Sequence, residues 1–140
     1  MTLIELLAVI VIIAIIAANA IPAIGGLIDN SRVGAIKSDA TNALSAAELY
    51  KMDVDTSTTT SVTIAKLIED QFLEDAGSLE DNTSITFGAS ASESTISTVA
   101  GSPATNGNIV ITLDAATKSS IAATPNSQRG ADGARTFTIE

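Results

Sequence analysis

The segment that decides the fold of this 140-residue chain is residues 1–28, which read MTLIELLAVIVIIAIIAANAIPAIGGLI. From Leu6 to Ala18 every side chain is aliphatic, and Glu5 is the only charged side chain in the segment. As a helix, residues 6–28 would be about 35 Å long, which is enough to cross the hydrocarbon of a bilayer. Because its apolar residues lie on all faces, we expect this helix to be buried in a membrane or in an assembly.

Glu5 needs a partner at the edge of this apolar run. A carboxylate that is desolvated without a partner is unfavourable by several kcal/mol. The nearest fixed positive charge is the α-amino group of Met1. In a bundle of staggered copies, the amine of one chain would reach the carboxylate of another, neutralising both and setting the register between subunits. The alternative is that Glu5 lies among lipid headgroups and has no role in assembly.

The N-terminal flank of the apolar run contains this one acid and no basic side chain. Signal peptides begin with a basic region, and membrane spans are normally oriented by flanking Lys or Arg. We therefore disfavour an uncleaved signal peptide or a simple anchor, and expect a basic leader to be removed before residue 1.

Pro22 weakens the predicted helix from within. A proline in a helix interior lacks an N–H donor and collides with the carbonyl four residues earlier, here that of Ala18. Asn19 and the Gly25-Gly26 pair flank it. Two interpretations are open: a modest kink in a membrane helix, or local melting when the helix leaves the bilayer and packs against other copies. Melting would lengthen the subunit, because extended chain rises about twice as far per residue as helix.

Residues 29–54 continue the helix with an amphipathic pattern. Apolar residues recur at spacings of three and four, which places on one face Val33, Ile36, Ala40, Ala43, Ala47, Tyr50 and Val54. The other faces carry Arg32, Lys37, Asp39, Asn42, Ser45, Glu48 and Lys51. The small alanines allow another element to approach closely, so we expect this half to pack on a domain formed by residues 55–140.

Residues 55–140 predict a small globular head. Residues 62–73 predict a short helix with Thr63 as its N-cap and with Ile64, Leu67, Ile68 and Phe72 facing inward. Four later runs are rich in Thr, Ile and Val and predict strands: Ser84–Phe87, Thr95–Val99, Asn108–Leu113 and Arg135–Ile139. The expected class is α+β, with a small antiparallel sheet packed on the C-terminal half of the long helix.

Composition disfavours catalysis and nucleic-acid binding. The chain has no Cys and no His, which removes thiol and imidazole chemistry and the usual zinc ligands. Its net charge of -9 repels nucleic-acid phosphates and anionic membrane surfaces. We predict a non-enzymatic protein without cofactor or metal. The acidic residues of 69–81 lack the spacing of a calcium loop and indicate a solvated surface, whereas Asp132-Gly133 fits either a calcium position or a turn.

The N-terminal residues Met1-Thr2-Leu3-Ile4-Glu5-Leu6-Leu7-Ala8-Val9-Ile10 resemble the mature N-terminus of a type IV pilin. The resemblance includes the acid at the fifth position and the proline at the twenty-second. It is strong over about the first 30 residues, and a weaker pattern extends to about Val54. Met1 departs from the family, which most often has phenylalanine there.

The resemblance implies that a prepilin peptidase cuts after a leader glycine and methylates the α-amino group of Met1. It also implies that Glu5 pairs with that amine of a neighbouring subunit. The unassembled pool would lie in the cytoplasmic (inner) membrane, from which an assembly platform and ATPase extract it into a type IV pilus of many copies. Such an extracellular filament on the cell surface serves adhesion, twitching motility or DNA uptake.

Two other functions remain open. A pseudopilin of a type II secretion or competence system shares the N-terminal signature and builds only a short filament. A monomeric membrane-anchored protein with a ligand-binding head is the more distant alternative.

Overall fold

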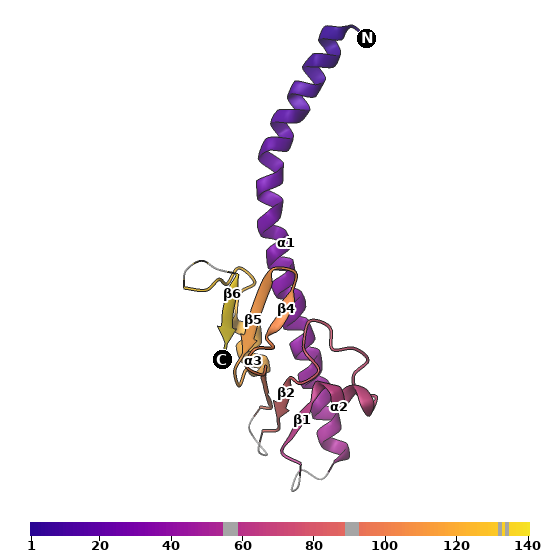
Figure 1. Ribbon diagram of the computed structural model, residues 1–140, viewed down its shortest axis with the longest axis vertical. Helices are drawn as coiled ribbons and strands as arrows, with labels where there is room; N and C mark the ends of the chain where they lie inside the picture. The colour runs from indigo at the N-terminus through magenta and orange to yellow at the C-terminus, as the bar shows by residue number, and fades with distance from the viewer. Residues whose placement is uncertain (55–58, 89–92, 132, 134) are drawn as a thin grey trace.

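The computed structural model describes residues 1–54, 59–88, 93–131, 133 and 135–140. One long helix carries a small head on its C-terminal half, while its N-terminal half extends beyond the head (Figure 1). The elements in chain order are α1 (Leu3–Asp53), β1 (Ser61–Thr63), α2 (Ile64–Glu69), β2 (Ser84–Thr86), β3 (Thr95–Ser97), β4 (Ala104–Asn106), β5 (Ile109–Leu113), α3 (Lys118–Ala123) and β6 (Thr136–Ile139).

Helix α1 is continuous from Leu3 to Asp53, so the prediction of one long helix is confirmed. It begins at the N-cap Thr2 and ends at the C-cap Val54, whose backbone is extended. Pro22 lies inside the helix without ending it. The apolar half curves gently along its length (Figure 1).

The amphipathic face of α1 forms the centre of the hydrophobic core, as its spacing predicts. All of its predicted inward residues from Val33 to Tyr50 are buried, and Val54 is partly buried. Leu44 and Ala46, which the pattern did not select, are buried as well. Facing this stripe are the buried side chains of the head, among them Ile64, Leu67, Ile85, Ile96, Ile109, Ile111 and Leu113. The alanines let α1 contact β3, β4, β5, α2 and α3.

The α+β class is confirmed, but the strands form two small sheets instead of one. Strands β1, β2 and β3 form an antiparallel sheet in which Val62 pairs with Ile85 and Ile85 with Ile96. Strands β4, β5 and β6 form the second sheet. In it, β4 and β5 are antiparallel, whereas β5 and β6 are parallel, with Ile111 opposite Phe137. Parallel neighbours need a long crossover, and the connection through α3 supplies it.

The predicted helix of residues 62–73 is shorter in the structure. Thr63 is its N-cap, as predicted, and accepts a hydrogen bond from the Lys66 N–H. Residues 61–63 instead form β1, because their backbone pairs with β2. The helix ends at Glu69, and Gln71 adopts a left-handed backbone with φ of 63°. Ile64 and Leu67 are buried, whereas Ile68 and Phe72 pack against the core only in part.

Candidate functional site

The candidate functional surface is the apolar half of α1, which the head does not cover. Of the 19 large apolar side chains that are exposed in the described residues, 16 lie between Met1 and Ile28. Among the described helices, α1 alone is long and apolar enough to cross a membrane. A surface of this kind marks a membrane or protein interface, because monomers in water rarely expose a large contiguous apolar patch.

At the tip of this surface, Glu5 is held by Thr2 of the same chain. The Glu5 Oε2 atom accepts hydrogen bonds from the Thr2 backbone N–H at 2.7 Å and from the Thr2 hydroxyl at 3.0 Å. The Thr2 hydroxyl in turn accepts from the Glu5 N–H at 3.3 Å. This is a capping box, which satisfies two backbone donors at the start of a helix.

Sequence reasoning paired Glu5 with the amine of another subunit and overlooked Thr2. The Thr-x-x-Glu spacing of residues 2–5 is the signal that would have predicted this contact. Met1 itself is 98% exposed, so its amine is accessible to a neighbouring molecule. The Glu5–Met1 contact between subunits stays a prediction.

The residues predicted to weaken α1 lie on its exposed half. The Asn19 side-chain amide donates to the Ile15 carbonyl at 3.0 Å. Among the described residues, no packing atom lies within 4 Å of the position that a Cβ would take at Gly25 or Gly26. These glycines therefore meet no packing requirement within one chain. The helix passes through Pro22 in the single subunit, and melting during assembly stays a prediction.

The neck, where α1 leaves the head, is fixed by a charged network that sequence reasoning did not select. The Asp29 carboxylate is 7% exposed and lies 3.0 Å from Arg135 Nη2. Arg32 Nη1 lies 3.9 Å from the other Asp29 oxygen and donates to Asn108 Oδ1 at 2.8 Å. These contacts join α1 to the β4–β5 turn and to the start of β6, residues that are distant in the sequence.

Further along α1, the polar residues beside the buried stripe also bind the head. Asp39 Oδ2 accepts from the Ser78 N–H at 2.8 Å, and Lys51 Nζ donates to the Gly88 carbonyl at 2.7 Å. Lys118, at the start of α3, donates to Glu48 Oε2 at 2.6 Å. These contacts hold the head to α1 on both sides of the buried apolar stripe. The C-terminal half of α1 and the head therefore form one unit.

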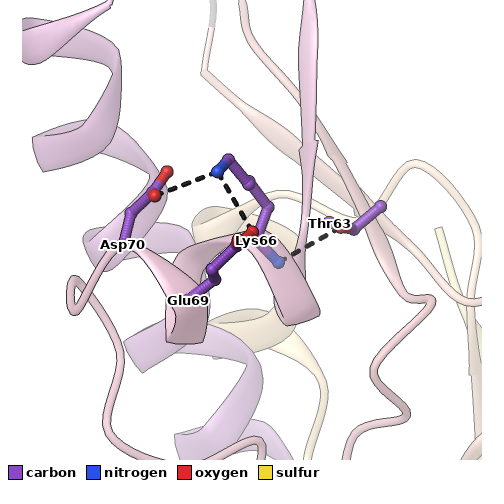
Figure 2. A network of polar contacts seen from close by, with 4 residues as sticks. All are labelled: Thr63, Lys66, Glu69 and Asp70. Atoms are coloured by element: carbon purple, nitrogen blue, oxygen red, sulfur yellow. Dashed lines mark hydrogen bonds and ion pairs between the residues drawn. The ribbon is translucent and has the colours of Figure 1, made fainter.

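The acidic region of residues 69–81 is partly neutralised by a lysine. Figure 2 shows Lys66 Nζ between two carboxylates, at 3.0 Å from Asp70 Oδ1 and 3.1 Å from Glu69 Oε2. These hydrogen bonds, the one to Asp70 first, raise the pKa of Lys66 above its ordinary value. Asp75 accepts from the Gly77 N–H at 2.8 Å and so shapes its own turn.

No group of three acidic side chains in the described ranges is arranged to hold a metal ion. Asp132, the other residue considered for calcium, lies outside the described residues. A surface hollow of about 380 Å³ lies between α1 and α3, and its one charged lining residue is Lys37. Lys37 Nζ donates to the Thr124 carbonyl and to Asn126 Oδ1, so its charge serves the attachment of the head.

Comparison of the chain with models of protein families, with curated proteins and with solved structures finds no match.

Proposed function

We propose that this chain is a pilin, a structural subunit that polymerises through its N-terminal helix into a type IV pilus or a closely related surface filament. The observation that carries the proposal is the division of α1. Its C-terminal half is built into the head, whereas 16 large apolar side chains between Met1 and Ile28 remain exposed. Two environments can cover them: the hydrocarbon of a membrane, or the same helix of other copies.

The shape of the chain suits both environments in turn. In the stored state α1 spans the cytoplasmic membrane, with the head at its surface. In the filament, the apolar halves pack together as a core and the heads form the outer wall. The head and the C-terminal half of α1 share one hydrophobic core, so neither needs to rearrange when the apolar half changes its surroundings.

The N-terminal residues support a pilin over an ordinary membrane anchor. The apolar run needs no acid to span a bilayer, and a charge at its edge is unfavourable there. A carboxylate at position 5 beside an exposed Met1 provides complementary charges at one end of each subunit. Together with the resemblance of residues 1–30 to type IV pilins, this arrangement favours staggered self-association aided by a prepilin peptidase, an assembly platform and an ATPase.

The proposal is tested by intact-mass and N-terminal peptide mass spectrometry on material sheared from cell surfaces. We expect a chain that begins at Met1 and carries about 14 Da of methyl on its amine. Long filaments made mostly of this chain are expected in the same fraction by electron microscopy. Processed chains confined to the membrane or to short filaments would favour a pseudopilin. An unprocessed chain that stays monomeric in detergent would contradict the proposal and favour a membrane-anchored binding protein.

A further inference from the structure

All three arginines of the chain converge on the neck, although the chain as a whole has a net charge of -9. Arg32 belongs to α1, and Arg135 reaches Asp29 at 3.0 Å. Arg129 Nη2 donates to Asn30 Oδ1 on the same part of α1, at 3.3 Å. We call Arg32, Arg129 and Arg135 the arginine collar.

We propose that the arginine collar binds the phosphate groups of anionic lipids while α1 spans the membrane. The proposal rests on the membrane placement of α1, but it does not require polymerisation. It therefore concerns the stored subunit, and its failure would leave the filament proposal intact.

The position of the collar along α1 fits this role. The apolar run ends at Ile28, and Arg32 follows four residues later, which is about 6 Å along a helix axis. Hydrocarbon occupies about 30 Å of a bilayer, and the headgroup layer adds roughly 5–7 Å on each side. The start of β6 and the β4–β5 turn lie at the end of the head from which the apolar half of α1 emerges (Figure 1). The collar is thus at the level of lipid phosphates when the apolar run is in hydrocarbon.

The collar also has donors and charge to offer. The Arg32 and Arg135 side chains are 37% and 48% exposed. A guanidinium carries five N–H donors in a planar fork that matches phosphate oxygens, and the described contacts of Arg135 use only one of its terminal nitrogens. Asp29 is the one carboxylate that pairs with the collar in the described part of the chain, so a positive excess remains.

The fold holds Arg32 in place from the side of the head. The β4–β5 turn requires a left-handed backbone at Gly107, where φ is 63°. A Cβ at this position would lie 2.7 Å from Arg32 Cζ, so glycine leaves the space that the guanidinium occupies. Arg32 then donates to Asn108 of the same turn at 2.8 Å. The collar follows directly after the apolar run, so lipid headgroups lie beside it while the run is in the membrane. We therefore favour lipid phosphates as its partner over the acidic head of a second copy.

Isotope labelling can test the contact without any mutation. The three arginines are the whole arginine content, so ¹³C-labelled arginine reports on the collar alone. The full chain is reconstituted in vesicles of phosphatidylcholine, with or without one-third phosphatidylglycerol, and ¹³Cζ–³¹P dipolar dephasing is measured by solid-state NMR. We expect strong dephasing that rises with phosphatidylglycerol. Dephasing that is absent, or equal in the two membranes, would overturn the proposal.

Charge-matched variants provide the second measurement. The triple variant R32Q/R129Q/R135Q and the control K51Q/K66Q/K118Q each remove three positive charges. Full chains in nanodiscs of equal phosphatidylcholine and phosphatidylglycerol are released, and their retained lipids are counted by native mass spectrometry. A basic residue beside an anionic leaflet contributes roughly fivefold in binding. We expect the wild type and the lysine control to be enriched in phosphatidylglycerol, and the arginine variant to lose that enrichment.

Two outcomes of this measurement would count against lipid binding. If both triple variants lose the phosphatidylglycerol enrichment equally, the enrichment depends on net charge and not on the arginine collar. Unchanged lipid enrichment in the arginine variant, combined with weaker self-association of the full chain, would assign the collar to contacts between copies.

Discussion

The Asp29 carboxylate lies 3.0 Å from Arg135 Nη2 and joins the first charged residue after the apolar run to the residue that precedes the last strand. Asp29 is nearly buried, whereas Arg135 is half exposed. The pair fixes β6 at the neck, at the boundary between the exposed apolar half of α1 and the half that packs on the head.

Breaking this pair should loosen the head. We expect Asp29→Asn and Arg135→Gln each to lower the free energy of unfolding by about 1–3 kcal/mol, because each breaks an ion pair whose carboxylate is nearly buried. The double variant should lose less than the sum of the two. Urea denaturation of the full chain in detergent micelles measures this through the fluorescence of Tyr50, the one tyrosine in a chain without tryptophan. Additive losses would show that the two residues act separately.

A carboxylate that sets the register between subunits should matter for assembly and not for insertion. We expect Glu5→Ala to enter membranes as the wild type does but to reach sheared filaments at less than a tenth of the wild-type amount. Glu69→Ala makes the same chemical change on the exposed head and should assemble normally. The amounts are compared by quantitative mass spectrometry of membrane and sheared fractions. Normal incorporation of Glu5→Ala would remove the register argument.

Replacing Pro22 restores the backbone donor that α1 lacks in its exposed half. Pro22→Ala should strengthen the helix locally by up to about 3 kcal/mol, because the Ala18 carbonyl regains a partner. In micelles, hydrogen exchange of the amides of residues 17–26 should slow, and Ala20→Leu serves as a control without a backbone change. Electron cryomicroscopy of wild-type filaments should show an unwound segment around Pro22. A continuous helix there would contradict melting.

Thr83 offers a stabilising substitution. Its hydroxyl is buried and has no hydrogen-bond partner among the described residues, although its backbone pairs with Ile64 and Glu80. Thr83→Val keeps the shape of the side chain and removes the hydroxyl that has no hydrogen-bond partner, so we expect a gain of about 1 kcal/mol in the free energy of unfolding. Thr83→Ser, which keeps the hydroxyl and loses the methyl, should be less stable than the wild type. Both are measured by urea denaturation in micelles.

Lys66 should make the stability of the folded chain depend on pH at alkaline values. Its pKa is raised in the folded chain by Asp70 and Glu69, so the folded state binds this proton more tightly than the unfolded state. The stabilisation is complete below the ordinary lysine value of 10.5 and is lost as the pH rises through the folded value. The difference in urea midpoint between wild type and Lys66→Met should therefore be constant from about pH 7 to 10 and shrink above it. A difference that persists at higher pH would assign the effect to packing.

The long helix and its buried face could be predicted from the sequence because both rest on short-range patterns. An aliphatic run of residues 6–18 and the three- and four-residue spacing from Val33 to Tyr50 carry the information locally. The N-cap at Thr63 is equally local.

The rest depends on contacts between distant residues. The parallel pairing of β5 and β6 follows from the path through α3, which no periodicity in either strand encodes. The sequence pattern around charged residues such as Arg32 and Lys51 is the same whether their side chains face water or donate to an oxygen atom of the head. The Asp29–Arg135 pair and the arginine collar appear only once the head closes on α1. By contrast, the Thr2–Glu5 capping box could have been predicted from the Thr-x-x-Glu spacing of residues 2–5.

In the proposed filament, Thr2 changes what Glu5 contributes to polymerisation. Within one subunit the carboxylate is already hydrogen-bonded, so binding the amine of a neighbour is an exchange between two satisfied states with a small net free energy. A subunit that docks out of place keeps its Thr2 contacts but brings an uncompensated negative charge into an apolar bundle, which is unfavourable by several kcal/mol. Burial of the aliphatic surface would then drive filament growth, while the Glu5 carboxylate would disfavour each subunit that is added in the wrong position.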